Sequence, residues 1–183
     1  MYVIGTRLLS VFLFSTMLSQ ANTQKVTFPR SRSEAKSPNG RYTIRNADDE
    51  KQEVAHTLTL IDTRSSSSSQ IYSYGRHVDV LWSPTSRAFV VNDYEGSDAS
   101  RPVLFTIPLA DQPLDLREKL TYFLRSQGKA KRVEGNHHVY FTVQRWLNGD
   151  KILCQVTGYG DADPKGFTER YVYKLGGGFR PYP

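Results

Sequence analysis

Three turn sequences that recur along the chain restrict its fold more than any other feature. Residues 37–41 (SPNGR), 83–87 (SPTSR) and 147–151 (LNGDK) each stand directly before an apolar, strand-like run. Proline presets φ and Asn-Gly tolerates positive φ, so these segments have the composition of tight turns. Trp82 and Trp146 directly precede the second and the third. The segments therefore mark an internal repeat.

Short runs of strand length follow the turns. Each repeat is expected to contain a strand, a polar loop and a second strand, at residues 42–46 and 55–62, 88–92 and 103–108, and 152–159 and 168–175. The first two turns are 46 residues apart, and a period in the forties with four short strands is typical of propeller blades. The sequence predicts a mainly β fold, an antiparallel meander of blade-like units that forms either a partial propeller or an open or curved sheet.

One segment has helical periodicity instead. Asp115 and Glu118 form a capping box, and Gly128 stands where a C-cap glycine is expected. One helical face is apolar and carries Leu116, Leu120, Phe123 and Leu124. We therefore expect one α-helix inserted near residues 116–127. The five serines at residues 65–69 predict a flexible loop.

Residues 37–41 and 82–92 resemble the TolB-like and peptidase-associated β-propeller repeats, whose blades carry a tryptophan, a Ser-Pro-Asp-Gly-Lys/Arg turn and an apolar strand. Asn39 and Thr85 stand where the family has aspartate, and the third copy lacks Ser-Pro. A closed ring typically needs 4–8 blades, and three units are present. The resemblance implies local blade geometry, and it implies no activity.

The N-terminal residues predict export. Arg7 precedes an apolar run at residues 8–18, and Ser19 and Ala21 occupy the positions that a signal peptidase reads. A spanning helix needs about 20 apolar residues, so we expect a signal peptide at residues 1–21 and no transmembrane segment after cleavage. The expected location is periplasmic or extracellular. Residues 22–36 are expected to be a linker or an edge segment, and residues 37–183 a single β-rich domain.

The net charge indicates which kind of partner to expect, and the single cysteine indicates a buried thiol. The chain has 24 basic and 18 acidic residues, a formal net charge of +6, which favours an anionic partner such as an acidic protein or an anionic envelope polymer. An exported protein rarely meets nucleic acid, so nucleic acid is not expected as a ligand. Cys154 is the only cysteine, and its apolar surroundings predict a buried thiol.

Two groups of residues are candidates for a binding surface. His77 and Asp79 share one strand face, which allows a metal or an acid/base pair, although an exposed polar face explains them equally well. Two acidic loops hold oxygen ligands close together, as calcium sites require, but neither has EF-hand spacing. The predicted surface comprises His77, Asp79, Asp93, Tyr94, Glu95, Tyr159, Asp161 and Asp163.

The motifs of common enzyme classes are absent from the sequence. No serine has the glycine-flanked spacing of a nucleophile elbow, and no phosphate loop or paired zinc-ligand motif is found. We therefore expect a small exported β-domain that binds a protein or an anionic envelope polymer, with no catalytic residue and no resident cofactor, bound Ca²⁺ being a minor alternative. The competing hypothesis is a metal-dependent or hydrolytic enzyme that uses His77, Asp79 and an acidic loop. An oligomer that completes a ring is also possible.

Overall fold

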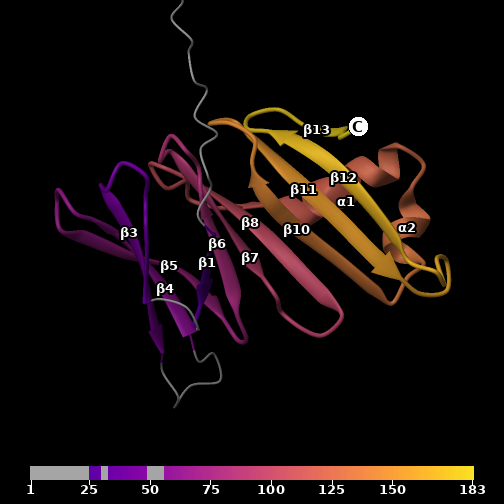
Figure 1. Ribbon diagram of the computed structural model, residues 1–183, viewed down its shortest axis with the longest axis horizontal. Helices are drawn as coiled ribbons and strands as arrows, with labels where there is room; N and C mark the ends of the chain where they lie inside the picture. The colour runs from indigo at the N-terminus through magenta and orange to yellow at the C-terminus, as the bar shows by residue number, and fades with distance from the viewer. Residues whose placement is uncertain (1–24, 30–32, 49–55) are drawn as a thin grey trace, which may run out of the picture.

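The computed structural model describes residues 25–29, 33–48 and 56–183. The described chain is mainly β with antiparallel sheets, as the sequence predicted, and it contains two helices. The strands form three groups that lie side by side (Figure 1). The predicted signal peptide, residues 1–21, lies outside the described residues, as does Ala55 at the start of one predicted strand.

The first group is a separate four-stranded antiparallel sheet. Its strands lie in chain order: β2 (Glu34–Lys36), β3 (Tyr42–Asp48), β4 (His56–Asp62) and β5 (Ser67–Tyr74). The loop prediction for residues 65–69 was wrong for Ser67 to Ser69. These serines pair with β4, Ser68 standing opposite Ile61, because ladder hydrogen bonds to a neighbouring strand override their low strand propensity.

The other two groups share a nine-stranded sheet. The middle group is β6 (Val78–Trp82), β7 (Ala88–Asp93) and β8 (Ala99–Thr106), extended by β1 (Lys25–Phe28) beside β6 and β9 (Leu114–Asp115) beside β8. The last group is β10 (His138–Trp146), β11 (Lys151–Tyr159), β12 (Phe167–Lys174) and β13 (Phe179–Pro181). A short parallel pairing of β8 with β10 joins the two groups.

Strands β1 and β2 fall within residues 22–36, for which the sequence predicted a linker or an edge segment. Each strand lies at the end of its sheet, β1 against β6 and β2 against β3. Val26 and Phe28 of β1 are buried. The segment thus contributes two edge strands and part of the core.

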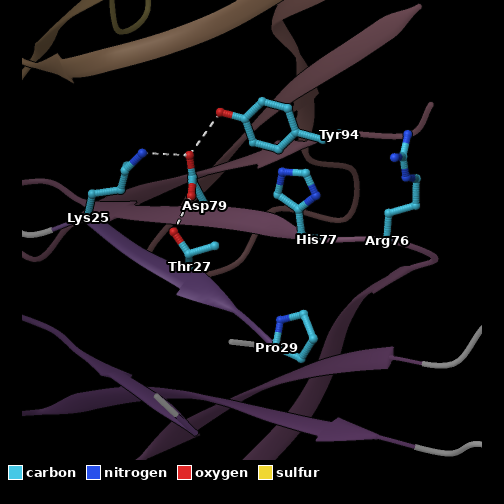
Figure 2. Close-up of a pocket in the computed structure, with 7 residues that line it drawn as sticks. All are labelled: Lys25, Thr27, Pro29, Arg76, His77, Asp79 and Tyr94. Carbon is cyan, nitrogen blue, oxygen red and sulfur yellow. Dashed lines mark hydrogen bonds and ion pairs between the residues drawn. The ribbon is translucent and has the colours of Figure 1, made fainter. Parts of the chain in front are cut away.

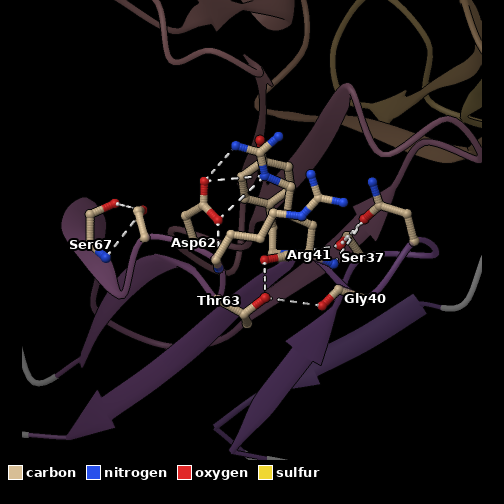
Figure 3. Close-up of polar contacts among 10 residues, drawn as sticks. Ser37, Gly40, Arg41, Asp62, Thr63 and Ser67 are labelled. Atoms are coloured by element: carbon tan, nitrogen blue, oxygen red, sulfur yellow. Dashed lines mark hydrogen bonds and ion pairs between the residues drawn. The ribbon is translucent and has the colours of Figure 1, made fainter.

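The three recurring turns join β2 to β3, β6 to β7 and β10 to β11, and in the first two a leading serine holds the turn. Ser37 Oγ accepts a hydrogen bond from the Tyr42 amide at 2.9 Å, and Ser83 Oγ accepts one from the Ala88 amide at 3.2 Å. Figure 3 shows the first turn. In the third turn Leu147 has no hydroxyl, and its amide donates to the Lys151 carbonyl at 2.8 Å.

The first turn is also joined to the turn between β4 and β5 (Figure 3). The Arg41 guanidinium donates to both carboxylate oxygens of Asp62, with Nη2 2.8 Å from Oδ2. Thr63 Oγ1 donates to the Arg41 carbonyl at 2.8 Å. Arg41 holds the pKa of Asp62 below its usual value by hydrogen bonding.

The same kind of indole hydrogen bond links the middle group to the first group and the last group to the middle group. Trp82 Nε1 donates to the Ala35 carbonyl at 3.1 Å, and Trp146 Nε1 donates to the Leu81 carbonyl at 3.0 Å. Ala35 and Leu81 occupy equivalent positions, two residues before the serine of their turns. The indole contact between successive groups therefore recurs at matching positions.

Two cores lie on opposite faces of the middle group. Val78, Val80 and Trp82 pack with the first group on one side, whereas Leu81 packs with the last group on the other. All residues of β6 and β7 are consequently buried. This division follows from the alternation of side chains along a strand.

The inserted helix was predicted correctly as α1 (Leu116–Ser126). The Asp115 side chain accepts a hydrogen bond from the Glu118 amide, as a capping box requires. Leu116, Leu120 and Leu124 are buried in the core between the middle and last groups. A second, short helix, α2 (Ala130–Glu134), follows and was not predicted, since its one turn carries no apolar period.

Trp82→Ala tests the packing of the core between the first and middle strand groups. Trp82 is 4% exposed and stacks on Tyr42, so we expect a loss of about 3–5 kcal/mol in the free energy of unfolding. Chemical denaturation monitored by circular dichroism measures it. A loss below about 1 kcal/mol would contradict the burial of the indole.

Gly149→Ala tests the contact between the second and third turns. An added Cβ at residue 149 would lie 2.5 Å from Cγ2 of Thr85, and overpacking of this kind costs about 1–3 kcal/mol. Thr85→Ser removes that methyl group and should restore most of the loss, measured as the free energy of unfolding. Gly178→Ala, where the space is open, is the control and should change little. Equal effects of the two glycine substitutions would refute the contact.

Candidate functional site

A cavity of about 730 Å³ opens beside β1 and β6 (Figure 2). Two of its wall residues, Lys25 and Thr27, come from β1, and the segment leading into β6 supplies Arg76 and His77. Its full lining is Lys25, Thr27, Pro29, Arg76, His77, Asp79 and Tyr94. The structure thus brings together three of the residues that the sequence singled out, His77, Asp79 and Tyr94.

Asp79 is the buried anchor of this cavity, with 3% of its surface exposed. Oδ1 accepts a hydrogen bond from Thr27 Oγ1 at 2.6 Å. Oδ2 accepts from Lys25 Nζ at 3.1 Å and from Tyr94 Oη at 2.9 Å. A buried carboxylate needs such partners, and here both oxygens are engaged. Asp79 therefore orients Lys25 and Tyr94 toward the cavity (Figure 2).

His77 forms an aromatic wall with Tyr94. The two rings stack with centroids 4.4 Å apart and an interplanar angle of 11°. Burial raises the pKa of the Tyr94 hydroxyl, so this group stays protonated and donates to Asp79. The imidazole faces the tyrosine ring, and within the described residues it forms no hydrogen bond with Asp79. The arrangement is a binding wall and lacks the His–Asp hydrogen bond of an acid/base pair.

The charged groups at the rim are cationic. Arg76 is exposed and forms no ion pair with any described residue. The Lys25 side chain is 56% exposed although it contacts Asp79. The described lining thus holds two cations and a single carboxylate whose oxygens are occupied, which favours an anionic group in the cavity.

Asp93 and Glu95 lie outside this cavity. Asp93 accepts a hydrogen bond from Tyr72 Oη at 2.8 Å through Oδ2, while Oδ1 is buried without a partner among the described residues. Burial raises the pKa of Asp93. Glu95 lies 3.6 Å from Arg101 and 3.7 Å from Arg117.

The second predicted acidic loop forms a separate group. Asp163 pairs with Arg132 and accepts a hydrogen bond from Asn136 at 2.9 Å. Asp161 lies 3.0 Å from a ring nitrogen of His137, and Tyr159 stacks on His138 with centroids 4.4 Å apart. The predicted surface is therefore divided, because Arg132 of α2 and residues of the 136–138 segment engage this loop locally.

The metal-binding alternative would need at least three ligand side chains close together. Within residues 25–29, 33–48 and 56–183, no three His, Cys, Asp or Glu side chains lie close enough to hold a metal ion. Cys154 is buried in the core, as predicted, and burial raises the pKa of its thiol. Among the described residues, no helix is long and apolar enough to cross a membrane.

Sequence reasoning missed Lys25, Thr27, Pro29 and Arg76. The first three stand in the segment expected to be a linker or an edge. Val26 and Phe28, which alternate with Lys25 and Thr27, are the signal that this segment is a half-buried strand. Which strand β1 joins is not encoded locally.

No protein-family model matches this chain, and no curated protein matches it.

Asp93→Asn should stabilise the fold at neutral pH. The folded pKa of Asp93 lies above the unfolded value, so the native state binds the proton more tightly and stability falls as pH rises through the folded pKa. The amide keeps an oxygen for Tyr72 and removes the buried charge. Urea unfolding at pH 7 and pH 3 measures the effect, and we expect a gain at pH 7 that disappears at pH 3. A loss of stability at pH 7 would contradict this assignment.

Proposed function

We propose that this protein is an exported β-domain that acts as a binding module for a protein or an anionic envelope polymer, and that the cavity beside β1 and β6 holds an anionic group of the partner. The observation that carries the proposal is the state of Asp79. Both of its oxygens accept hydrogen bonds from Lys25, Thr27 and Tyr94. The carboxylate is thereby committed to shaping the cavity.

The rim supports an anionic ligand. Arg76 and Lys25 both reach solvent at the cavity, and an arginine guanidinium recognises carboxylates and phosphates through paired hydrogen bonds. The stacked His77 and Tyr94 add an aromatic surface for the uncharged part of the ligand. A hydrolytic role is supported less well, because His77 stacks on Tyr94 and no carboxylate of the described residues forms a hydrogen bond with its ring.

We also propose that the three strand groups are propeller-like blades of the TolB-like type in an open stack. The recurring indole hydrogen bond and the shared serine turn support this reading. The first group supports an open stack, since its residue at the position equivalent to Trp82 is Lys36. The first group therefore has no indole for a preceding blade.

Arg76→Glu tests the binding function. Titration calorimetry at low salt with digalacturonate and with a short glutamate peptide covers an acidic sugar and an acidic protein segment. We expect at least one to bind, and Arg76→Glu to weaken that binding about tenfold or more, which corresponds to about 1.4 kcal/mol.

The matched control is Arg64→Glu, which makes the same charge change in the exposed turn before β5, at the far end of that strand from Arg76. Its affinity should equal that of the unmodified protein. Binding that both substitutions weaken equally would indicate a general charge effect, and absence of binding by both ligands would overturn the cavity assignment.

A further inference from the structure

The sheet β10–β13 has one face whose residues belong to neither buried core of the described chain. Its other face packs against α1 and the middle strand group through Cys154, Tyr171 and Tyr173. We call the face outside the two cores the outer face. Its residues follow from the strand register: His138, Tyr140, Thr142, Arg145, Lys151, Leu153, Gln155, Thr157, Tyr159, Thr168, Arg170, Val172, Lys174 and Arg180.

The charge of the outer face is of one sign. None of the residues named above is acidic. Five of them are lysine or arginine: Arg145, Lys151, Arg170, Lys174 and Arg180. None of the five forms an ion pair with a described residue. Arg170 donates to Gln155 Oε1 at 3.2 Å. The face therefore attracts anions over a broad area.

Lys151 and Lys174 face each other directly across β11 and β12. Like charges at opposite positions destabilise a sheet, and strands lie about 4.8 Å apart. One acidic residue at either position would turn this repulsion into attraction. The pair is thus unfavourable in the isolated domain and becomes favourable when an anion lies between the two ammonium groups.

The other half of the outer face suits sugars. It carries the hydroxyl groups of Thr142, Thr157 and Thr168, and Tyr159 is 48% exposed. A sugar ring needs hydrogen-bond partners for its hydroxyl groups and an apolar surface for its ring face. This half supplies both beside the cations.

A folded acidic protein fits the outer face less well. Protein interfaces have an apolar, desolvated centre, whereas Leu153 and Val172 at the centre of this face are only 6% and 2% exposed. Single-stranded nucleic acid stacks successive bases on several aromatic rings. Tyr159 is the exposed aromatic among the outer-face residues, and its ring already stacks on His138.

We infer that the outer face of β10–β13 binds a linear acidic polysaccharide, with the cations at its carboxylates and the threonines and Tyr159 at its sugar rings. This inference rests on the proposed function, of which it names the partner class and a second contact surface. The cavity beside β1 then takes a single acidic group, and the outer face follows an extended stretch of polymer.

The test compares Lys151→Glu/Lys174→Glu with Lys119→Glu/Lys131→Glu, a control with the same charge change on exposed residues of α1 and α2. Binding of long polygalacturonate is measured by fluorescence anisotropy between 25 and 300 mM salt, roughly the range where charge screening changes most. We expect the unmodified protein to bind with an affinity that falls as salt rises. The polymer affinity of Lys151→Glu/Lys174→Glu should fall at least tenfold, and that of the control less than threefold.

The single variant Lys151→Glu excludes misfolding as the cause. It creates an ion pair with Lys174, so its melting temperature should stay equal or rise while its polymer affinity falls. No polygalacturonate binding at 25 mM salt, or equal losses in the outer-face and helix variants, would overturn the inference. Tighter binding of single-stranded DNA or polyglutamate than of polygalacturonate would overturn the choice of a polysaccharide.

The outcomes separate the two sites. Arg76→Glu should weaken the binding of the short ligands to the cavity. Lys151→Glu/Lys174→Glu should have the larger effect on the binding of the long polymer. If the outer-face variant has no effect while Arg76→Glu does, the proposed function stands and this inference fails. If the reverse is found, the outer face binds polymer and the cavity assignment fails.

Discussion

The burial of β6 and β7 on both faces is the constraint on which the rest of the structure depends. Two cores meet at this central pair of strands, and the indoles of Trp82 and Trp146 each bridge to the preceding strand group. A buried carbonyl without a partner costs about 1–3 kcal/mol, so each indole fixes the position of one group against the next. The same contacts hold the candidate cavity in place, because Asp79 belongs to β6.

The polar groups inside this frame position neighbouring elements. The side-chain amide of Asn92 donates to the Val143 carbonyl at 2.8 Å and accepts from the Val143 amide at 2.9 Å, and it thereby holds β10 at its irregularity. Asp79 plays the corresponding role for Lys25 and Tyr94. The cationic rim and the outer face of β10–β13 lie on surfaces that these contacts hold in place, and both favour anions.

The predicted binding surface and the candidate cavity overlap in part, for a physical reason. His77 and Asp79 were placed on one face correctly, because alternation along a strand fixes the side on which each residue lies. Lys25 comes from a strand 54 residues away from Asp79, and such pairing depends on the whole sheet. Asp161 and Asp163 resemble Asp93 as acidic loop residues in the sequence, yet Arg132 of α2 pairs with Asp163 and His137 contacts Asp161.

The sequence by itself determined the local structure: the three turns, the alternating strands and the capped helix α1, because these depend on neighbours a few residues apart. Only the tertiary structure decided where β1 pairs, that Ser67 to Ser69 form a strand, and which of the basic residues share the outer face. Those features require ladder hydrogen bonds and burial between segments distant in the chain, and local composition carries no record of which distant strand will supply them.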